Sequence, residues 1–220
     1  MADAPHDASE IDRACRLFYA VRDQIRYSAY GVRLEPETFR ATHVLESGFG
    51  WCVTKSCLLA AVCRAAGIPC RLGYADVRNH LATEKLLAAM GTDVFYYHGY
   101  NELFLAGRWV KATVAFNRSL CEKAGLKPLD FDGRTDSIYH PYALDGRRHM
   151  EYLREYGAYT DVPHADIVAC FRENYPLMQM FDEQNGAAPA TGSTPEPQLA
   201  DFENEIAAET AAKRRAASSE

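Results

Sequence analysis

The sequence lacks the features that mark membrane, secreted and nucleic-acid-binding proteins. None of its apolar runs approaches the roughly 20 residues of a membrane-spanning helix, and its start, MADAPHDASEIDRACRLF, has neither the basic residues nor the apolar run of a signal peptide. Basic residues are not in excess either. The formal net charge is −6, so a phosphate backbone or an anionic membrane would not be attracted. We therefore expect a cytoplasmic protein with no nucleic-acid or membrane partner.

Cysteine pairs at metal-binding spacing are missing as well. Four of the seven cysteines lie in GFGWCVTKSCLLAAVCRAAGIPCR, residues 48–71, but successive ones are 5, 6 and 7 positions apart. Zinc ligands usually come in pairs about two to four positions apart. An odd number of cysteines in a reducing compartment also argues against a disulfide framework. We expect free thiols, no metal and no other cofactor.

Large apolar side chains are scarce at the C-terminal end. From residue 186 onward the chain is rich in Ala, Pro, Thr, Ser and Glu, a composition that cannot offset the entropy of ordering. We expect residues 186–220 to be a mostly disordered tail. The preceding residues 1–185 are expected to form one domain, with core motifs at about 15–117 and a C-terminal extension over 118–185.

Hydrophobic periodicity predicts a mixture of helices and strands. Apolar residues recur every three or four positions over 10–26 and 52–66, which indicates two packed helices. Shorter helices are expected over 81–91, 148–156 and 164–174. The runs 70–77 and 93–116 are rich in branched and aromatic side chains, which favours strands, and the AGR around Gly107 predicts a hairpin turn within the second run.

These elements place Cys52 at the start of a helix. A helix N-terminus lowers the pKa of a thiol, and a nearby histidine lowers it further. His98 lies on the first strand of the predicted hairpin, where a packed sheet could present it to Cys52. We expect the other cysteines to be small apolar residues of the structure: Cys15, Cys57, Cys63, Cys70, Cys121 and Cys170.

Two motifs in this region resemble the transglutaminase-like family. GFGWCVTKSCLLAAVCRAAGIPCRLGYADV is similar to the family's core, in which G-x-C opens a helix of small and apolar residues that leads to R-A-x-G-I-P-x-R and a strand. HGYNELFLAGRWV is similar to the second motif, a histidine followed by an aromatic residue, a glutamate and a strand ending at tryptophan. The resemblance implies an α+β, papain-like fold with the cysteine-bearing helix packed on an antiparallel sheet. It also implies that Cys52 is the nucleophile and His98 the general base.

The third motif departs from the family. Transglutaminase-like proteins usually have an aspartate four residues after that tryptophan, where it orients the histidine, and Thr113 stands there in this chain. A threonine hydroxyl accepts a hydrogen bond but supplies no negative charge. Asn117 is the alternative, because an asparagine fills this role in papain-like enzymes. Strand alternation would put both residues on one face, so both remain candidates.

An oxyanion hole is required for acyl transfer. Its expected donors are the backbone N–H of Cys52 and, as a weaker candidate, Trp51, whose alternative role is packing against the sheet. The irregular segment FDGRTDSIYHPY, residues 131–142, is of the kind that often forms part of a binding site. It is a candidate wall of the substrate site.

Three more residues are expected near the substrate. Tyr100 and Glu102 share a strand face with His98. Lys111 lies on the predicted face of Thr113, where it could bind an acidic substrate or remain solvated. Four further histidines could line a pocket, but we expect them to be solvated or satisfied by a hydrogen bond: His43, His80, His140 and His149.

The sequence thus predicts a thiol-dependent amide hydrolase or acyl transferase that acts on a protein, a peptide or a small amide. The alternative is a catalytically inactive transglutaminase-like module for binding or scaffolding, which Thr113 favours and the presence of both Cys52 and His98 opposes. A structural protein that assembles through its C-terminal segment is a further alternative. Hydrolysis and transfer to an amine use the same thioester, so the sequence does not separate them, and it leaves the oligomeric state open.

Overall fold

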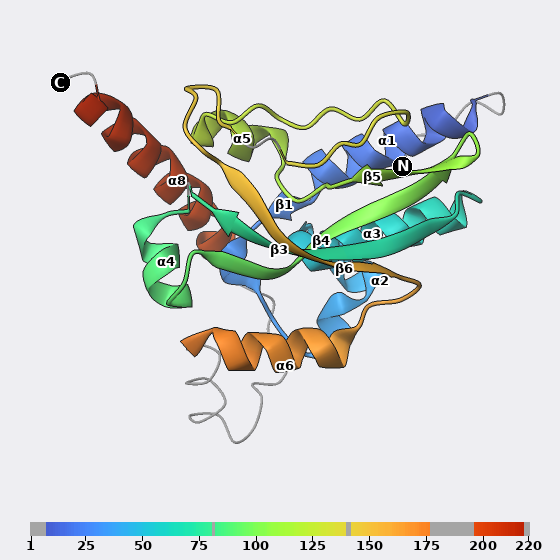
Figure 1. The fold of residues 1–220 in the computed structure, drawn as a ribbon, viewed down its shortest axis with the longest axis horizontal. Helices are drawn as coiled ribbons and strands as arrows, with labels where there is room; N and C mark the ends of the chain where they lie inside the picture. Colours follow the sequence, from blue (N-terminus) through green and yellow to red (C-terminus); the bar gives the residue numbers. More distant parts are fainter. Residues whose placement is uncertain (1–7, 81, 140–141, 177–195, 218–220) are drawn as a thin grey trace.

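A four-stranded antiparallel sheet forms the centre of the fold. The computed structural model describes residues 8–80, 82–139, 142–176 and 196–217. The strands lie in the order β5-β4-β3-β6 (Figure 1), and their bounds are Cys70–Asn79 for β3, Val94–Leu105 for β4, Arg108–Ala112 for β5 and Met150–Tyr159 for β6. Two shorter strands, β1 (Arg26–Tyr27) and β2 (Phe49–Gly50), pair in parallel outside this sheet.

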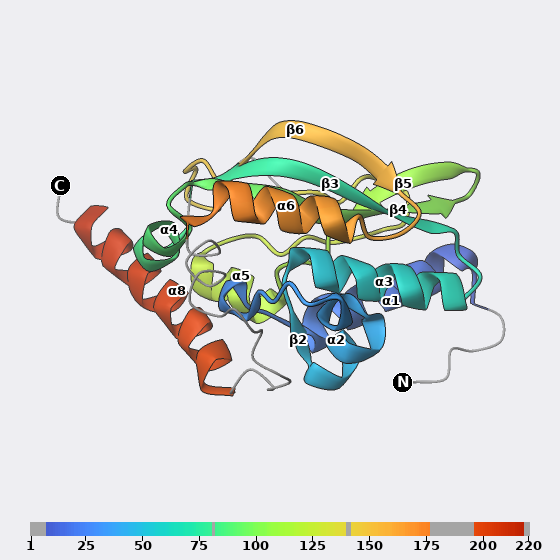
Figure 2. The same cartoon turned by 90° about the horizontal axis from the view of Figure 1, so that it is seen from below.

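Helices α1, α2 and α3 gather on one side of the sheet (Figure 2). The helices are α1 (Glu10–Gln24), α2 (Ala41–Ser47), α3 (Cys52–Ala65), α4 (Glu84–Met90), α5 (Arg118–Ala124), α6 (His164–Asn174) and α8 (Glu196–Ala217), with 3-10 turns η1 (Ala29–Gly31) and η2 (Pro36–Phe39). Among the described residues, none of these helices combines the length and apolar character needed to cross a membrane. The predicted α+β fold, with the cysteine-bearing helix α3 packed on an antiparallel sheet, is confirmed.

The central helix is α3, because it is buried on nearly every side. Val53 and Leu59 are fully enclosed, and even Lys55 is 0% exposed. The Lys55 ammonium donates hydrogen bonds to the carbonyl oxygens of Arg22 (3.0 Å) and Ile25 (2.5 Å). These carbonyls lie at the end of α1, where a helix leaves C=O groups without partners. Lys55 therefore fastens α3 to the end of α1.

β4 and β5 form the predicted hairpin. Leu105 pairs with Arg108 across a two-residue turn, in which Ala106 and Gly107 have φ values of 49° and 81°. A turn with positive φ at both positions matches the twist of the strands that it joins. The helices predicted over 10–26, 52–66, 81–91 and 164–174 are also present, with bounds that differ by a few residues.

A β-bulge in β4 comes immediately before His98. Between the pairs that His98 and Phe95 make with β3, β4 contains one residue more than its neighbour, and Tyr97 takes a φ of 50°. The Asp76 carboxylate accepts a hydrogen bond from the N–H of Tyr97 (3.2 Å). Bulges re-aim the side chains that follow them, so this one sets the direction in which His98 leaves the strand.

The helix predicted over residues 148–156 is wrong. Met150–Tyr159 form β6, which pairs with β3 along its length. The segment contains several aromatic residues that suit a pleated surface, and pairing with β3 supplies backbone hydrogen bonds that a pattern search within the segment does not register. Tertiary contact therefore overrides the local preference here.

The C-terminal segment also differs from the sequence-based expectation. Composition predicts that residues 186–220 are mostly disordered, with at most a transient helix over 205–217. Residues 186–195 and 218–220 lie outside the described part of the chain, and Glu196–Ala217 form α8, which lies beside α5 (Figure 1). Phe202 is 2% exposed, and its ring centroid lies 5.8 Å from that of Tyr27. Glu203 is buried as well. One aromatic anchor and one buried carboxylate dock this helix, and average composition does not count such long-range contacts.

Candidate active site

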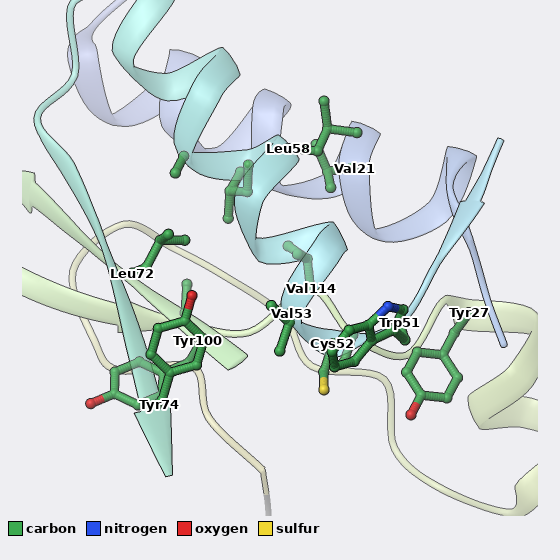
Figure 3. Close-up of a cluster of buried hydrophobic side chains, with 14 of the residues drawn as sticks. Val21, Tyr27, Trp51, Cys52, Val53, Leu58, Leu72, Tyr74, Tyr100 and Val114 are labelled. Carbon is green, nitrogen blue, oxygen red and sulfur yellow. The ribbon is translucent and has the colours of Figure 1, made fainter. Parts of the chain in front are cut away.

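Cys52 is the first residue of α3 and lies at the edge of the apolar core (Figure 3). Trp51 precedes it in an extended conformation, and the Trp51 N–H donates a hydrogen bond to the hydroxyl of Thr54 (3.0 Å). Figure 3 shows the sulfur pointing away from α3, toward the same side as the hydroxyl of Tyr27. The start of a helix presents free N–H groups and a partial positive charge. Cys52 thus lies at the start of a helix, as the sequence predicts. Only 6% of the Cys52 surface is exposed.

β4 approaches the start of α3 at Gly99. A Cβ atom at this position would lie 2.9 Å from the carbonyl oxygen of Cys52 and 3.0 Å from the Cα of Val53, closer than carbon atoms normally approach other atoms. The backbone of Gly99 also lies close enough to the Cys52 thiol to lower its pKa. Because the N–H of Gly99 belongs to the peptide bond that follows His98, the thiol lies against the His98–Gly99 peptide.

The Cys52 thiol is protonated at neutral pH. Burial raises its pKa to about 11, although hydrogen bonds from the backbone of Gly99 and Val53 act in the opposite direction. Desolvation of a charged thiolate thus outweighs the favourable start of the helix. The expectation of a lowered thiol pKa is wrong for this enclosed arrangement.

His98 directly precedes Gly99 in β4, after the bulge at Tyr97. It is 2% exposed, and its ring meets that of Tyr139 edge to face at 5.0 Å. Its enclosed Nε2 has no hydrogen-bond partner among the described residues, the Cys52 thiol included. Burial and then the charge of His149 lower the pKa of His98 to about 3, so the imidazole is neutral at pH 7.

Thr113 lies close to this pair but does not hold the imidazole. Its hydroxyl donates a hydrogen bond to the carbonyl oxygen of Gly99 (3.4 Å), and the side chain is buried. Gly99 directly follows His98 in β4. Thr113 therefore binds the residue next to His98, and not the imidazole that the third motif predicts as its partner. In this arrangement Thr113 supports the backbone of β4.

Asn117 belongs to a different junction. Strand pairing in β5 ends at Ala112, so the predicted strand face does not extend to Asn117, which instead precedes α5 as its N-cap. Its Oδ1 accepts a hydrogen bond from the N–H of Tyr27 (3.0 Å), and its Nδ2 donates one to Glu203 (3.3 Å). The expectation that Asn117 shares a strand face with Thr113 is therefore wrong, and its observed contacts join β1 to α8.

Tyr100, Glu102 and Lys111 form a paired group further along the sheet. The Glu102 carboxylate accepts a hydrogen bond from Arg71 (2.6 Å). The Lys111 ammonium donates one to Glu155 (2.9 Å) and lies 5.1 Å from the ring centroid of Tyr100. Each charge in the group thus already has an opposite charge beside it.

Trp51 packs among aromatic rings. Its ring centroid lies 5.7 Å from that of Phe39 and 5.5 Å from that of Phe171, and it is 4% exposed. These contacts join η2 and α6 to the start of α3. Trp51 therefore packs in the core, which is its alternative role in the sequence analysis. It packs against η2 and α6, and not against the sheet as that alternative expects.

Sequence reasoning did not select two residues that lie beside His98. Tyr139 contacts the His98 ring, and His149 lies 5.7 Å from the Tyr139 ring and 6.2 Å from that of Phe116, between centroids. Tyr139 belongs to residues 131–142, the segment predicted to form a wall of the substrate site. That prediction for the segment is the only sequence feature that points to Tyr139. His149 is one of the four histidines that could line a pocket, and it lines both cavities described below, but its position beside Tyr139 depends on the fold.

Two cavities adjoin this aromatic cluster. The larger, about 40 Å³, lies between α8 and the rest of the fold, and it has room for roughly three water molecules. The smaller is lined by Tyr139 and His149. Neither has Cys52 or His98 in its lining. Because Cys52 is 6% and His98 2% exposed, a substrate carbonyl would reach them only after side chains or elements move.

The described residues contain no group of three or more His, Cys, Asp or Glu side chains that could hold a metal ion. All seven cysteines are free.

Comparison with known proteins identifies a family. A family model described as the transglutaminase-like superfamily matches residues 2–114, just over half of the 220-residue chain. The matched region contains Cys52, His98 and Thr113 and ends before Asn117 and Tyr139. A comparison with curated proteins finds no match.

Proposed function

Because this chain belongs to the transglutaminase-like superfamily, we propose that it is a thiol enzyme that hydrolyses an amide or ester, or transfers its acyl group, through Cys52. The substrate is a protein, a peptide or a small amide. One observation supports this best: the peptide that joins His98 to Gly99 lies against the start of α3 at Cys52. The enclosed Nε2 of His98 also has no hydrogen-bond partner among the described residues. Such an atom costs about 1–3 kcal/mol of stability, and a catalytic role is one of the explanations for it.

The proposed reaction uses His98 twice. It first accepts the proton of the Cys52 thiol as the sulfur attacks the carbonyl carbon, and it then gives that proton to the leaving amine or alcohol. Water or a second amine resolves the thioester. The neutral imidazole, which follows from its lowered pKa, is the form that can accept a proton.

The enclosed site opposes that first proton transfer. The pKa values of Cys52 and His98, about 11 and about 3, differ by about eight, which corresponds to ~11 kcal/mol. A turnover of 1–10³ per second allows a total barrier of only about 13–17 kcal/mol. Burial is the largest cause of both pKa shifts. Entry of substrate or water would therefore bring the pKa values of Cys52 and His98 closer together. In this proposal, the enclosed arrangement is the resting form of the enzyme.

A non-catalytic relative is the second candidate. The hydroxyl of Thr113 binds the carbonyl oxygen of Gly99 and not the imidazole, and the Nε2 of His98 does not bind the Cys52 thiol. In such a relative the same residues would serve packing alone. Charge on Cys52 would then never develop, and the two candidates differ in whether a Cys52 acyl-enzyme forms.

The test is acetylation of Cys52 by p-nitrophenyl acetate, followed by mass spectrometry of the intact chain and of its peptides. We expect Cys52 to be acetylated much faster than Cys121, a second buried thiol, whose pKa is raised to about 12 by burial. His98→Asn should slow acetylation of Cys52 by about 10²–10⁴-fold, the usual size of a general-base contribution. Equal rates at Cys52 and Cys121, or no effect of His98→Asn, would favour the non-catalytic relative.

A further inference from the structure

After α5 the chain returns to the site beside β5. The N–H of Thr113 donates to the carbonyl oxygen of Ser137 (2.9 Å), and the N–H of Ser137 donates to that of Lys111 (2.8 Å). This short parallel pairing fixes the path of residues 137–139. It brings Tyr139, two residues later, against His98.

Packing on three sides holds the ring of Tyr139. Its centroid lies 5.0 Å from that of His98, 5.2 Å from that of Phe116 and 5.7 Å from that of His149. Edge-to-face and tilted contacts at these distances are favourable for aromatic rings. The position of Tyr139 therefore depends on its ring, and its hydroxyl is not needed to keep it there.

The hydroxyl of Tyr139 is enclosed and has no hydrogen-bond partner among the described residues. Burial raises the pKa of Tyr139 well above its ordinary value, and negative charge on Tyr27 and on Cys52 acts in the same direction. The hydroxyl of Tyr139 consequently keeps its proton and can donate a hydrogen bond at every physiological pH. The ring of Tyr139 lies against that of His98, the residue that the proposed mechanism pairs with Cys52. A buried donor without an acceptor is costly in the resting state.

We infer that the hydroxyl of Tyr139 is the second donor of the oxyanion hole, beside the backbone N–H of Cys52. This inference rests on the proposed function. The donor gains its acceptor only when the substrate oxygen becomes negative, so it stabilises the transition state more than the resting enzyme. Trp51, whose ring is held among Phe39 and Phe171, is then not needed as a donor.

The acylation step has a defined electron balance. The Cys52 sulfur forms a bond to the carbonyl carbon, the thiol proton moves to His98, and the C=O π pair moves onto the oxygen, which accepts the hydrogen bond from Tyr139. The pair then returns to re-form C=O as the bond to the leaving group breaks. The leaving group takes the proton from His98, and a Cys52 thioester remains.

The test variant is Tyr139→Phe, which keeps the ring and removes only the hydroxyl. Two reactions of Cys52 are compared by peptide mass spectrometry: acetylation by p-nitrophenyl acetate and alkylation by iodoacetamide. Alkylation displaces iodide in one step and forms no oxyanion. We expect acetylation to slow by about 10²–10³-fold, with the alkylation rate and the thermal midpoint preserved.

Tyr74→Phe is the matched control. Tyr74 is also fully buried, and its hydroxyl also has no partner among the described residues. Its ring contacts Tyr97 and Tyr159, whereas that of Tyr139 contacts His98. Loss of this hydroxyl should leave both reactions of Cys52 unchanged.

Three results would overturn the inference. Equal acetylation in wild type and Tyr139→Phe would remove Tyr139 from the oxyanion hole while leaving the thiol enzyme intact. Equal slowing of acetylation and alkylation would show that Tyr139 acts on the thiol itself. If the wild-type Cys52 is acetylated no faster than Cys121, the proposed function fails and the assignment of Tyr139 fails with it.

Discussion

Substitution of Gly99 by alanine should push the start of α3 away from β4. The added Cβ would meet the carbonyl oxygen of Cys52 at 2.9 Å and the Cα of Val53 at 3.0 Å, whereas non-bonded carbon atoms prefer about 3.5–4.0 Å. Both atoms belong to the backbone of a central helix, so no side-chain rotation relieves the overlap. Either the helix or the strand must shift.

The expected loss follows from this overlap. Overpacking a core by one methyl group costs about 1–3 kcal/mol, and the reduced entropy of the unfolded chain with alanine returns about 0.4–1 kcal/mol. The net loss in the free energy of unfolding for Gly99→Ala is therefore about 1–2 kcal/mol. For a chain of this length that lowers the thermal midpoint by about 2–8 °C.

Calorimetry measures the midpoint, and peptide mass spectrometry after iodoacetamide treatment measures the alkylation rate of Cys52. Because alkylation of an enclosed thiol depends on local opening, we expect it to become faster by up to about tenfold for each 1.4 kcal/mol lost at this contact. Gly107→Ala is the control, because a Cβ at Gly107 meets no atom within 4 Å. Its positive φ of 81° makes alanine costly in stability, but Cys52 should react as in wild type.

The reasoning would be refuted if Gly99→Ala left the alkylation rate of Cys52 at its wild-type value and lowered the midpoint no more than Gly107→Ala. That result would mean that β4 and α3 separate without cost. The close approach of Gly99 would then not define the environment of the thiol.

Two further predictions concern the buried charges. Burial lowers the pKa of Lys55 from 10.5 to about 7, so between these pH values the unfolded chain binds more protons and this residue makes stability rise with pH. In urea unfolding, Lys55→Met should reduce that rise between pH 7 and 8.5. Glu203→Gln weakens the contact with Lys123 (2.6 Å) by about 1 kcal/mol, which should speed amide hydrogen exchange in α8 about fivefold.

Each of these variants has a control on the surface. Lys127→Met removes an exposed ammonium and should leave the dependence of stability on pH unchanged. Glu46→Gln removes an exposed carboxylate of α2 and should leave exchange in α8 unchanged. An identical pH dependence in Lys55→Met and wild type would contradict the lowered pKa. Unchanged exchange in Glu203→Gln would show that Glu203 does not dock α8.

Local sequence patterns were sufficient for the elements that carry the site. Helical periodicity with Gly67 and Pro69 at its end predicts α3, and the two-residue turn at Gly107 predicts the β4–β5 hairpin. These signals act over a few residues, so they can be read without the fold. For the same reason Cys52 could be placed at a helix start and His98 on a strand.

Local sequence patterns failed where contacts with distant segments decide the secondary structure. Residues 150–159 form a strand because β3 is available to pair with them. Glu196–Ala217 form α8, which Phe202 and Glu203 dock onto the fold. In each case the stabilising partner is remote in the sequence, so neither composition nor periodicity reports it.

By itself, the sequence determined that this protein has a transglutaminase-like core, with a thiol at a helix start and a histidine on the neighbouring hairpin. Only the tertiary structure decided that both groups are buried and neutral, that Asn117 binds Tyr27 and Glu203, and that Tyr139 faces His98. The physical reason is that ionisation and hydrogen bonding depend on the three-dimensional surroundings of an atom. Segments distant along the chain supply those surroundings.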